Sequence, residues 1–378
     1  MTENIRGKLF ELIRSGMDLE VPNVLLSVEE CKELFEFATR QSIQSIVFRG
    51  MKKAGIPEEI MRGYDRNRLK ETFQVIQQES ALKCVGMALE EAKIPYILLK
   101  GAVLRGLYPA LDLRTSCDID ILVQEETLTD AVQSIERQTD FKTVKKAYHD
   151  VSMMNSNVHL ELHFSIKENA ENIDRLLSRA WEYANPIDAE GYRFAFTPEY
   201  MIFYTVAHMS HHFLHGGLGI RPFLDLWLLR NKTEYDEATV KALCAECGIQ
   251  KFYEECCNLT QVWFEKKEHT ETTEILEKVC LSGGVFGIDQ FRTAARQRKK
   301  RGFKYIVNRI FPPAYEVREF YRDEEGKKHT LLYYYIKRLI SWFGKTRRVE
   351  LKKQVNEIMS ADHDYLDLTE DLFNRLEL

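Results

Sequence analysis

The run CDIDILV, residues 117–123, constrains the fold more than any other stretch of the chain. It is short and rich in β-branched and apolar residues, which is typical of a buried strand. Because side chains alternate along a strand, Asp118 and Asp120 point to one face while Ile119 and Ile121 point into the core. A carboxylate in such a strand is costly to desolvate unless a cation lies beside it. The run therefore predicts a cation at one face of a sheet.

The aspartate pair indicates a divalent metal ion. Two like charges this close repel each other unless one cation neutralises both. A small number of oxygen ligands suits Mg²⁺, with Mn²⁺ as a substitute. A two-metal arrangement needs a third carboxylate, and NVHLELHFSI (157–166) offers Glu161 on the same strand face as His163. If this strand neighbours 117–123, Glu161 completes the site.

The stretch before the aspartates offers groups for phosphate. IPYILLK (94–100) is typical of a short apolar strand that leads the chain to Lys100 and Gly101, where a helix over 101–110 is expected to begin. A helix N-terminus with a glycine binds anions, and Lys100 adds a point charge. Arg114 could hold a further phosphate oxygen with its planar guanidinium.

The hydrophobic patterns predict three regions. Residues 1–78 show helical spacing, 79–190 mix short strands with helices, and 191–378 are again helical. Within the middle region one strand is expected around 141–154. A chain of 378 residues is long enough for such regions to have cores of their own. The N-terminus has charges throughout, and nowhere do about 18 apolar residues run together. We therefore expect a cytoplasmic protein with no membrane segment.

A family resemblance follows from these motifs. KGAVLRGLYPALDLRTSCDIDILV, HLELHF and HMSHHFLHGGLGIRPFLDL together are similar to the bacterial "uncharacterised nucleotidyltransferase" family of the DNA polymerase β-like superfamily. The resemblance implies an α+β fold in which a small mixed sheet with helices forms the nucleotidyltransferase core. N-terminal helices and a C-terminal helical domain would flank that core.

The resemblance also implies roles for individual residues. Asp118 and Asp120 correspond to the metal-binding, catalytic pair and Glu161 to the third acidic position. Gly101 matches the glycine of the superfamily's phosphate-binding turn. Ala102 stands in that turn where serine or glycine is usual.

A second group of candidates lies in the histidine-rich segment 207–227. His208, His212 and their neighbours His211 and His215 recur at helical spacing, so they could line a cleft, satisfy core hydrogen bonds or bind zinc. A glycine-rich loop follows, and then Arg221, which could reach phosphates with Asp225 one helical turn on to orient it. The same two residues could instead form a pair that only ties two helices.

Each polar candidate also has a structural interpretation. Asp118 and Asp120 could cap backbone amides at a strand end, and Glu161 could be a solvated edge residue. Lys100 and Arg114 could be ordinary surface charges. Four cysteines in a C-x2-C-x8-C-C pattern are more simply explained as buried thiols than as a zinc site, namely Cys244, Cys247, Cys256 and Cys257.

A basic stretch is more simply explained as a solvated helix face than as an RNA site. Its residues are Arg292, Arg296, Arg298, Lys299, Lys300, Arg301 and Lys304.

These observations favour a Mg²⁺-dependent nucleotidyltransferase that moves a nucleoside monophosphate from an NTP, ATP among them, to an acceptor and releases pyrophosphate. The fold fixes the donor chemistry, so a small molecule, a protein or an RNA end all suit as acceptor. The net charge of −5 does not favour nucleic acid. Two alternatives stay open: a catalytically silent nucleotide-binding or partner-binding protein, and a toxin–antitoxin enzyme acting on RNA or protein. The sequence does not indicate the oligomeric state.

Overall fold

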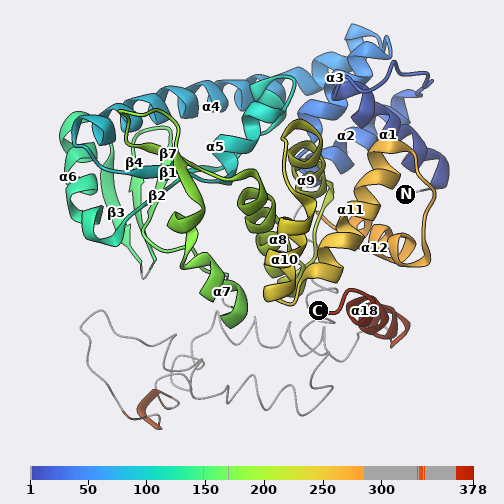
Figure 1. The fold of residues 1–378 in the computed structure, drawn as a ribbon. Helices are drawn as coiled ribbons and strands as arrows, with labels where there is room; N and C mark the ends of the chain where they lie inside the picture. The colour runs from blue at the N-terminus through green and yellow to red at the C-terminus, as the bar shows by residue number, and fades with distance from the viewer. Residues whose placement is uncertain are drawn as a thin grey trace.

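One long helix, α4 (Glu58–Glu91), connects the N-terminal helices to a sheet, and it spans the top of the molecule in Figure 1. Its first turns join the N-terminal core through Met61, while Ala81, Val85 and Leu89 pack on the sheet. The computed structural model describes residues 2–147, 149–168, 170–284, 330, 332–334, 336 and 363–378.

The predicted N-terminal helices are confirmed as α1 (Glu3–Gly16), α2 (Val28–Arg40) and α3 (Gln44–Lys53). Helix α2 begins with a capping box. The Ser27 side chain accepts a hydrogen bond from the Glu30 amide, and Glu30 accepts one from the Ser27 amide. The predicted boundary at residue 78 falls inside α4.

Helices α1 and α3 cross at two glycines. A Cβ on Gly16 would overlap the carbonyl oxygen of Ile46, and one on Gly50 would overlap that of Leu12. Both obstacles are backbone atoms, which cannot rotate away as a side chain can. The helices pack this closely only because both positions lack a side chain.

Gly50→Ala is therefore expected to destabilise the protein by about 1–3 kcal/mol, the usual cost of overpacking. Gly7→Ala on α1 is the matched control, because nothing lies within 4 Å of a Cβ there. That control should be neutral or stabilising by up to about 1 kcal/mol, since alanine favours helix more than glycine does. Urea denaturation of the two variants would measure the difference, and equal midpoints would contradict this account of the crossing.

The sheet has seven strands in the order β3-β4-β5-β2-β1-β7-β6. Strand β2 pairs in parallel with β5 and antiparallel with β1, and β1 pairs in parallel with β7. The sheet is therefore mixed, as predicted. Its strands are β1 (Tyr96–Leu98), β2 (Asp118–Val123), β3 (Lys142–Lys146), β4 (Asp150–Met154), β5 (His159–His163), β6 (Ala184–Pro186) and β7 (Arg193–Phe196).

Three features of this region differ from the prediction. The stretch expected to hold one strand, 141–154, holds the antiparallel pair β3 and β4. Strands β6 and β7 extend the sheet, with β7 beyond residue 190. The helix expected over 101–110 is only five residues long, α5 (Lys100–Leu104), and continues as a 3₁₀ turn.

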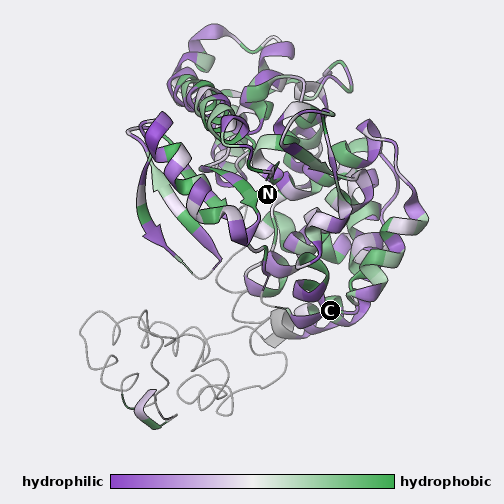
Figure 2. Ribbon diagram, turned by 60° about the vertical axis from the view of Figure 1, so that its left-hand side comes forward, coloured by the Kyte–Doolittle hydropathy of each residue, from purple (hydrophilic) through white to green (hydrophobic). Residues whose placement is uncertain are grey.

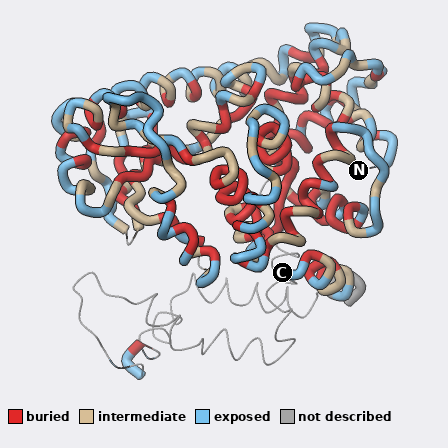
Figure 3. Tube along the Cα trace, viewed as in Figure 1, coloured by how far each residue is buried: buried red, intermediate tan, exposed pale blue. Residues whose placement is uncertain are grey.

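The two faces of the sheet have different coverings. On one face Ile119, Ile121, Leu160 and Leu162 pack against α4 and α6 (Leu128–Gln138) in a core of their own. Leu122 on the other face joins the large core of the helical region. Figure 2 shows hydrophobic and hydrophilic residues alternating along the helices of the molecule, and Figure 3 shows the buried residues running through the sheet and the central helices.

Helices make up the described part of the chain after β7, as predicted. Among the described residues, none of the helices combines the length and apolar character that a membrane crossing requires. The remaining helical elements are η1 (Arg105–Leu107), η2 (Leu111–Leu113), η3 (Glu125–Thr127), α7 (Glu171–Leu177), η4 (Ala180–Tyr183), α8 (Pro198–His215), α9 (Ile220–Lys232), α10 (Glu237–Glu246), α11 (Gln250–Glu265), α12 (Glu271–Ser282) and α18 (His363–Arg375).

Candidate functional site

Three carboxylates meet on the sheet face opposite α4 and α6. Strands β2 and β5 are parallel neighbours, as the sequence required for a shared site, and their register sets Asp120 opposite Glu161 and Asp118 opposite His159. Ligand atoms of Asp118, His159 and Glu161 lie within 4.8 Å of one another, and so do those of Asp120, Glu161 and His163. Glu161 belongs to both groups.

The carboxylates repel one another where water is scarce. Burial, together with the negative charges of Asp120 and Glu161, raises the pKa of Asp118 to about 6. Asp120 is half-buried as well, but a hydrogen bond from His163 and the charges of His163 and Lys100 outweigh burial and lower its pKa. The site therefore holds more negative charge than its own residues neutralise.

His163 lies between two of the acids. Its Nε2 is 3.1 Å from Asp120 Oδ1 and 3.5 Å from Glu161 Oε2. Burial disfavours its charged form, yet these two partners raise the pKa of His163 to about 9. The hydrogen bond to His163 is also the main cause of the lowered pKa of Glu161. The two carboxylates therefore favour a positive charge on the His163 ring beside them.

The donor set fits a hard divalent cation. Asp118, Asp120 and Glu161 offer carboxylate oxygens, the ligand type that Mg²⁺ and Mn²⁺ prefer. The raised pKa of Asp118 reports a repulsion that such a cation would relieve. The three side chains come from adjacent strands in a fixed register, so their positions do not depend on a loop.

Lys100 lies close to the carboxylates, but its immediate partners come from elsewhere. Its Nζ is 3.6 Å from Glu168 Oε1 and 4.0 Å from the centre of the Tyr204 ring. Burial lowers the pKa of Lys100 to about 8, although Glu168 and Asp120 favour its charge. Lys100 is therefore a half-buried cation, with its side chain 14% exposed, on the same face as the acids and not an ordinary surface charge.

The helix that begins at Lys100 is too short to supply the anion site expected at its N-terminus. A Cβ on Gly101 would make only ordinary van der Waals contacts, 3.5 Å from Ser116 and 3.6 Å from a terminal guanidinium nitrogen of Arg114, so packing does not require a glycine there. Ala102 packs against the core between the sheet and α4, away from the carboxylate face. It borders an open cavity of about 690 Å³ on that other side.

Glu168 is the principal site residue that the sequence analysis missed. Its carboxylate is 7% exposed and accepts a hydrogen bond from His208 Nδ1 at 2.8 Å, while His212 Nε2 is 2.9 Å from His208 Nε2. Burial opposes ionisation, but Lys100 and His208 lower the pKa of Glu168 to about 2. Glu168 lies in the loop after β5, so no strand or helix periodicity in the sequence identifies that position.

The surroundings of both histidines favour the neutral ring. Burial and the charge of Lys100 lower the pKa of His208, and burial with His208 and His211 lowers that of His212 to about 3. Together with Glu168 they form a hydrogen-bonded row next to Lys100. In the part of the chain that the structure describes, the groups suited to a metal ion lie on β2, β5 and the start of β4, and not on α8, the helix that carries the two histidines.

Asp225 pairs with Arg114 and not, as expected, with Arg221. The Arg114 guanidinium donates to both Asp225 oxygens, at 2.9 and 3.0 Å, and Tyr108 donates to the first at 2.8 Å. Arg221 donates to the carbonyl oxygen of Thr115. The expected pairing is wrong because the chain before β2 folds back onto α9 and brings a second arginine into reach.

The other candidates lie apart from this site. Cys244, Cys247, Cys256 and Cys257 are buried free thiols, and burial raises the pKa of each. The basic stretch from Arg292 to Lys304 lies outside the described residues.

A mixed sheet that holds clustered carboxylates next to buried cationic side chains defines a class of proteins suited to phosphate chemistry with a divalent metal. The chain belongs to the family described as "Uncharacterised nucleotidyltransferase", whose profile matches residues 27–265. The matched span runs from the N-cap of α2 to the last residue of α11 and so includes every site residue named above. No curated protein sequence matches the chain. The family supports nucleotidyl transfer as the general activity and a nucleotide as substrate.

Proposed function

We propose that the protein is a Mg²⁺-dependent nucleotidyltransferase with a polymerase β-like core. The observation that carries the proposal is the meeting of Asp118, Asp120 and Glu161 on neighbouring parallel strands. In the reaction an acceptor oxygen bonds to the α-phosphorus of an NTP. The bond from that phosphorus to the bridging oxygen of the β-phosphate breaks, and pyrophosphate leaves.

Asp118 and Asp120 would hold the metal, with Glu161 as the third ligand. Bound Mg²⁺ would neutralise charge on the triphosphate and orient it, and Mn²⁺ could replace it. Glu161 is 30% exposed and its pKa is lowered, so it is ionised and accessible to take the proton of an incoming hydroxyl.

The cations beside the acids would position phosphate. Lys100 is held over Tyr204 and fixed by Glu168, so little side-chain entropy is lost when it binds an anion. Asp225 fixes the planar guanidinium of Arg114 and leaves its NH1 beside Gly101. Arg221 lies next to this pair and adds a second guanidinium.

Isothermal titration of ATP, GTP, CTP and UTP, each with and without Mg²⁺, tests the proposal. We expect at least one of the four nucleotides to bind, and to bind more tightly with the metal. The same nucleotide should then release pyrophosphate when candidate acceptors are added. Failure of all four nucleotides to bind in the presence of Mg²⁺ and of Mn²⁺ would refute the proposal.

The affinity for the nucleotide is expected to fall as pH rises through about 8. Lys100 is charged below its pKa of about 8 and loses its proton above it, and the groups that face it are Glu168, Asp120, Arg114 and Tyr204. Loss of one charge-assisted phosphate contact corresponds to roughly a tenfold weaker Kd between pH 7 and pH 9.5.

Lys100→Arg tests the origin of this pH dependence, since arginine stays charged over the whole range. The variant should lose the weakening centred near pH 8, whereas a change centred near pH 9 would belong to His163 between Asp120 and Glu161. Equal pH dependence in the two proteins would show that another group is responsible.

A further inference from the structure

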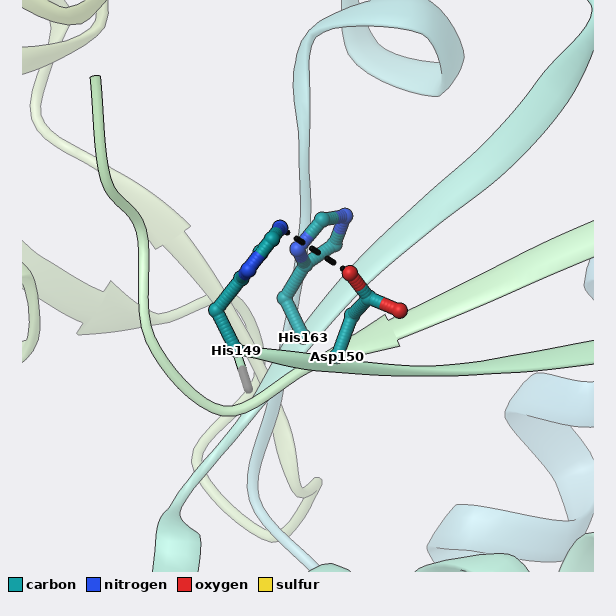
Figure 4. Close-up of side chains that lie close together, drawn as sticks. All are labelled: His149, Asp150 and His163. Atoms are coloured by element: carbon teal, nitrogen blue, oxygen red, sulfur yellow. Dashed lines mark ion pairs between the residues drawn. The ribbon is translucent and has the colours of Figure 1, made fainter. Parts of the chain in front are cut away.

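A second cluster of ligand atoms lies beside the carboxylates, on the outer side of His163. It contains His149 and Asp150 at the start of β4 and His163 at the end of β5, where Asp150 is the cross-strand neighbour of His163. Their ligand atoms lie within 4.8 Å of one another. Figure 4 shows the three side chains close together, with a dashed line for the ion pair between His149 and Asp150. The His149 Nε2 atom is 3.0 Å from Asp150 Oδ2.

The backbone holds His149 in this position although it precedes the strand. Its carbonyl oxygen accepts hydrogen bonds from the amides of Phe164 and Ser165, at 3.1 and 3.4 Å. These bonds tie the residue to the end of β5, next to His163. The His149 and His163 rings are therefore neighbours, with centroids 6.0 Å apart.

His163 is oriented as a metal-ligating histidine usually is. Such a histidine commonly donates the proton of its other ring nitrogen to a carboxylate, which fixes the ring and its tautomer. Here Nε2 faces Asp120 at 3.1 Å and Glu161 at 3.5 Å. A metal ion at Nδ1 would displace the proton that the charged ring carries there, while the proton on Nε2 keeps its hydrogen bond to Asp120.

We propose that His149, Asp150 and His163 form a transition-metal site, separate from the carboxylate site and linked to it through His163. Two imidazoles and one carboxylate suit Zn²⁺ or Co²⁺ rather than Mg²⁺, which prefers oxygen ligands alone. Three protein ligands with an open fourth position are typical of zinc sites that keep a water molecule. His149 is 41% exposed, which leaves room for that water.

The site goes beyond the proposed nucleotidyl transfer, and its metal binding does not depend on it. An ion held there would fix the His163 ring so that its Nε2 donates a hydrogen bond to Asp120, one of the acids proposed to bind Mg²⁺. His163 would then lie between two divalent cations, which would repel each other. We therefore expect Zn²⁺ at the cluster to weaken the binding of Mg²⁺ to the carboxylates.

The test is titration of the full chain with ZnSO₄ alone and with CoCl₂ alone, without nucleotide, by calorimetry and visible absorption. Cys84 and Cys117 are exposed, so every protein in the series carries Cys84→Ser and Cys117→Ser to remove thiolate ligands. We expect one Zn²⁺ per chain in this background. His149→Asn and Asp150→Asn should each weaken its Kd at least about tenfold, because each removes one of three ligands.

Two further variants separate this site from other sources of binding. Asp118→Asn removes a ligand of the carboxylate site that is not a partner of His163, and His215→Ala removes an exposed histidine on α8. Both should keep the Kd for Zn²⁺ within about threefold. Loss of Zn²⁺ in Asp118→Asn with full binding in His149→Asn would place the ion at the carboxylates and overturn the proposal.

Two other results would also overturn it. These are an unchanged Kd in both His149→Asn and Asp150→Asn, and the absence of Zn²⁺ binding in the parent protein. Circular dichroism of each variant verifies folding, and the two ligand variants act independently, so a misfolded Asp150→Asn still leaves His149→Asn to decide. If Zn²⁺ binds but no nucleotide does, the metal site stands and the proposed function falls.

Discussion

Replacing Asp118 and Asp120 together with asparagine is expected to lower the rate of nucleotidyl transfer at least about a thousandfold, because the neutral amides no longer hold the metal or balance its charge. The same change should leave the fold intact. Asparagine has nearly the shape of aspartate, and both side chains lie on the open face of β2, away from the core formed by Ile119 and Ile121. The variant should therefore be folded and inactive.

The thermal stability of this variant gives a second readout. In the absence of metal the wild-type carboxylates repel, as the raised pKa of Asp118 indicates. The double variant loses the repulsion at Asp118 but also the charge-assisted hydrogen bond between His163 and Asp120, so its melting temperature without metal should stay close to that of the wild type. Asp130→Asn on the exposed side of α6 is the matched control and should change neither property.

An inactive variant with a strongly lowered melting temperature would favour a structural role for the two aspartates, and an active one would remove them from the mechanism. In the wild type, Mg²⁺ should raise the melting temperature by stabilising the folded state. The double variant should lose that rise. This last comparison needs no knowledge of the acceptor.

The carboxylate cluster could be predicted from the sequence because strand geometry is local. Alternation along 118–123 and 159–163 fixes which side chains share a face, and the apolar residues fix which face is buried. One assumption was needed, that the two strands are neighbours. The structure satisfies this condition, because β2 and β5 are parallel neighbours that are connected along the chain through α6, β3 and β4.

The partners of the cationic residues could not be predicted in the same way. Arg114 and Asp225 are 111 positions apart, and Lys100 and Glu168 are 68 apart. No periodicity links such positions, since their contact depends on how the helical region packs on the sheet. Glu168 lies outside any strand or helix, so no pattern in the sequence identified it as a site residue.

The length of α5 was overestimated for a similar reason. The segment after Lys100 has helical residue types, but it must turn back so that Arg105 can reach the backbone carbonyl of Arg114 and the side chains of Glu79 and Gln78. Arg105 is 2% exposed, a position that a charged residue takes only with such partners. Tertiary contacts of this kind override local propensity.

Asp225→Ala is expected to destabilise the protein by about 3–5 kcal/mol, the usual effect of removing one partner of a buried ion pair. Arg114 and Asp225 are 8% and 7% exposed, so the guanidinium left behind has little access to water. Tyr108→Phe removes one hydrogen bond to the same carboxylate and should cost only about 1 kcal/mol. Urea denaturation monitored by circular dichroism measures both, and a similar effect of the two changes would contradict the assignment of a buried charge pair.

The double variant Arg114→Met with Asp225→Leu separates the structural role of this pair from its proposed role in binding phosphate. Replacing both charges with apolar residues removes the uncompensated charge, so the double variant should be more stable than Asp225→Ala alone. If Arg114 also contacts the triphosphate, the double variant should regain stability without regaining nucleotide affinity. Recovery of both stability and nucleotide affinity would mean that the pair only joins α9 to the chain before β2. Apolar side chains can replace an ion pair that serves packing alone, but they cannot replace a guanidinium that binds phosphate.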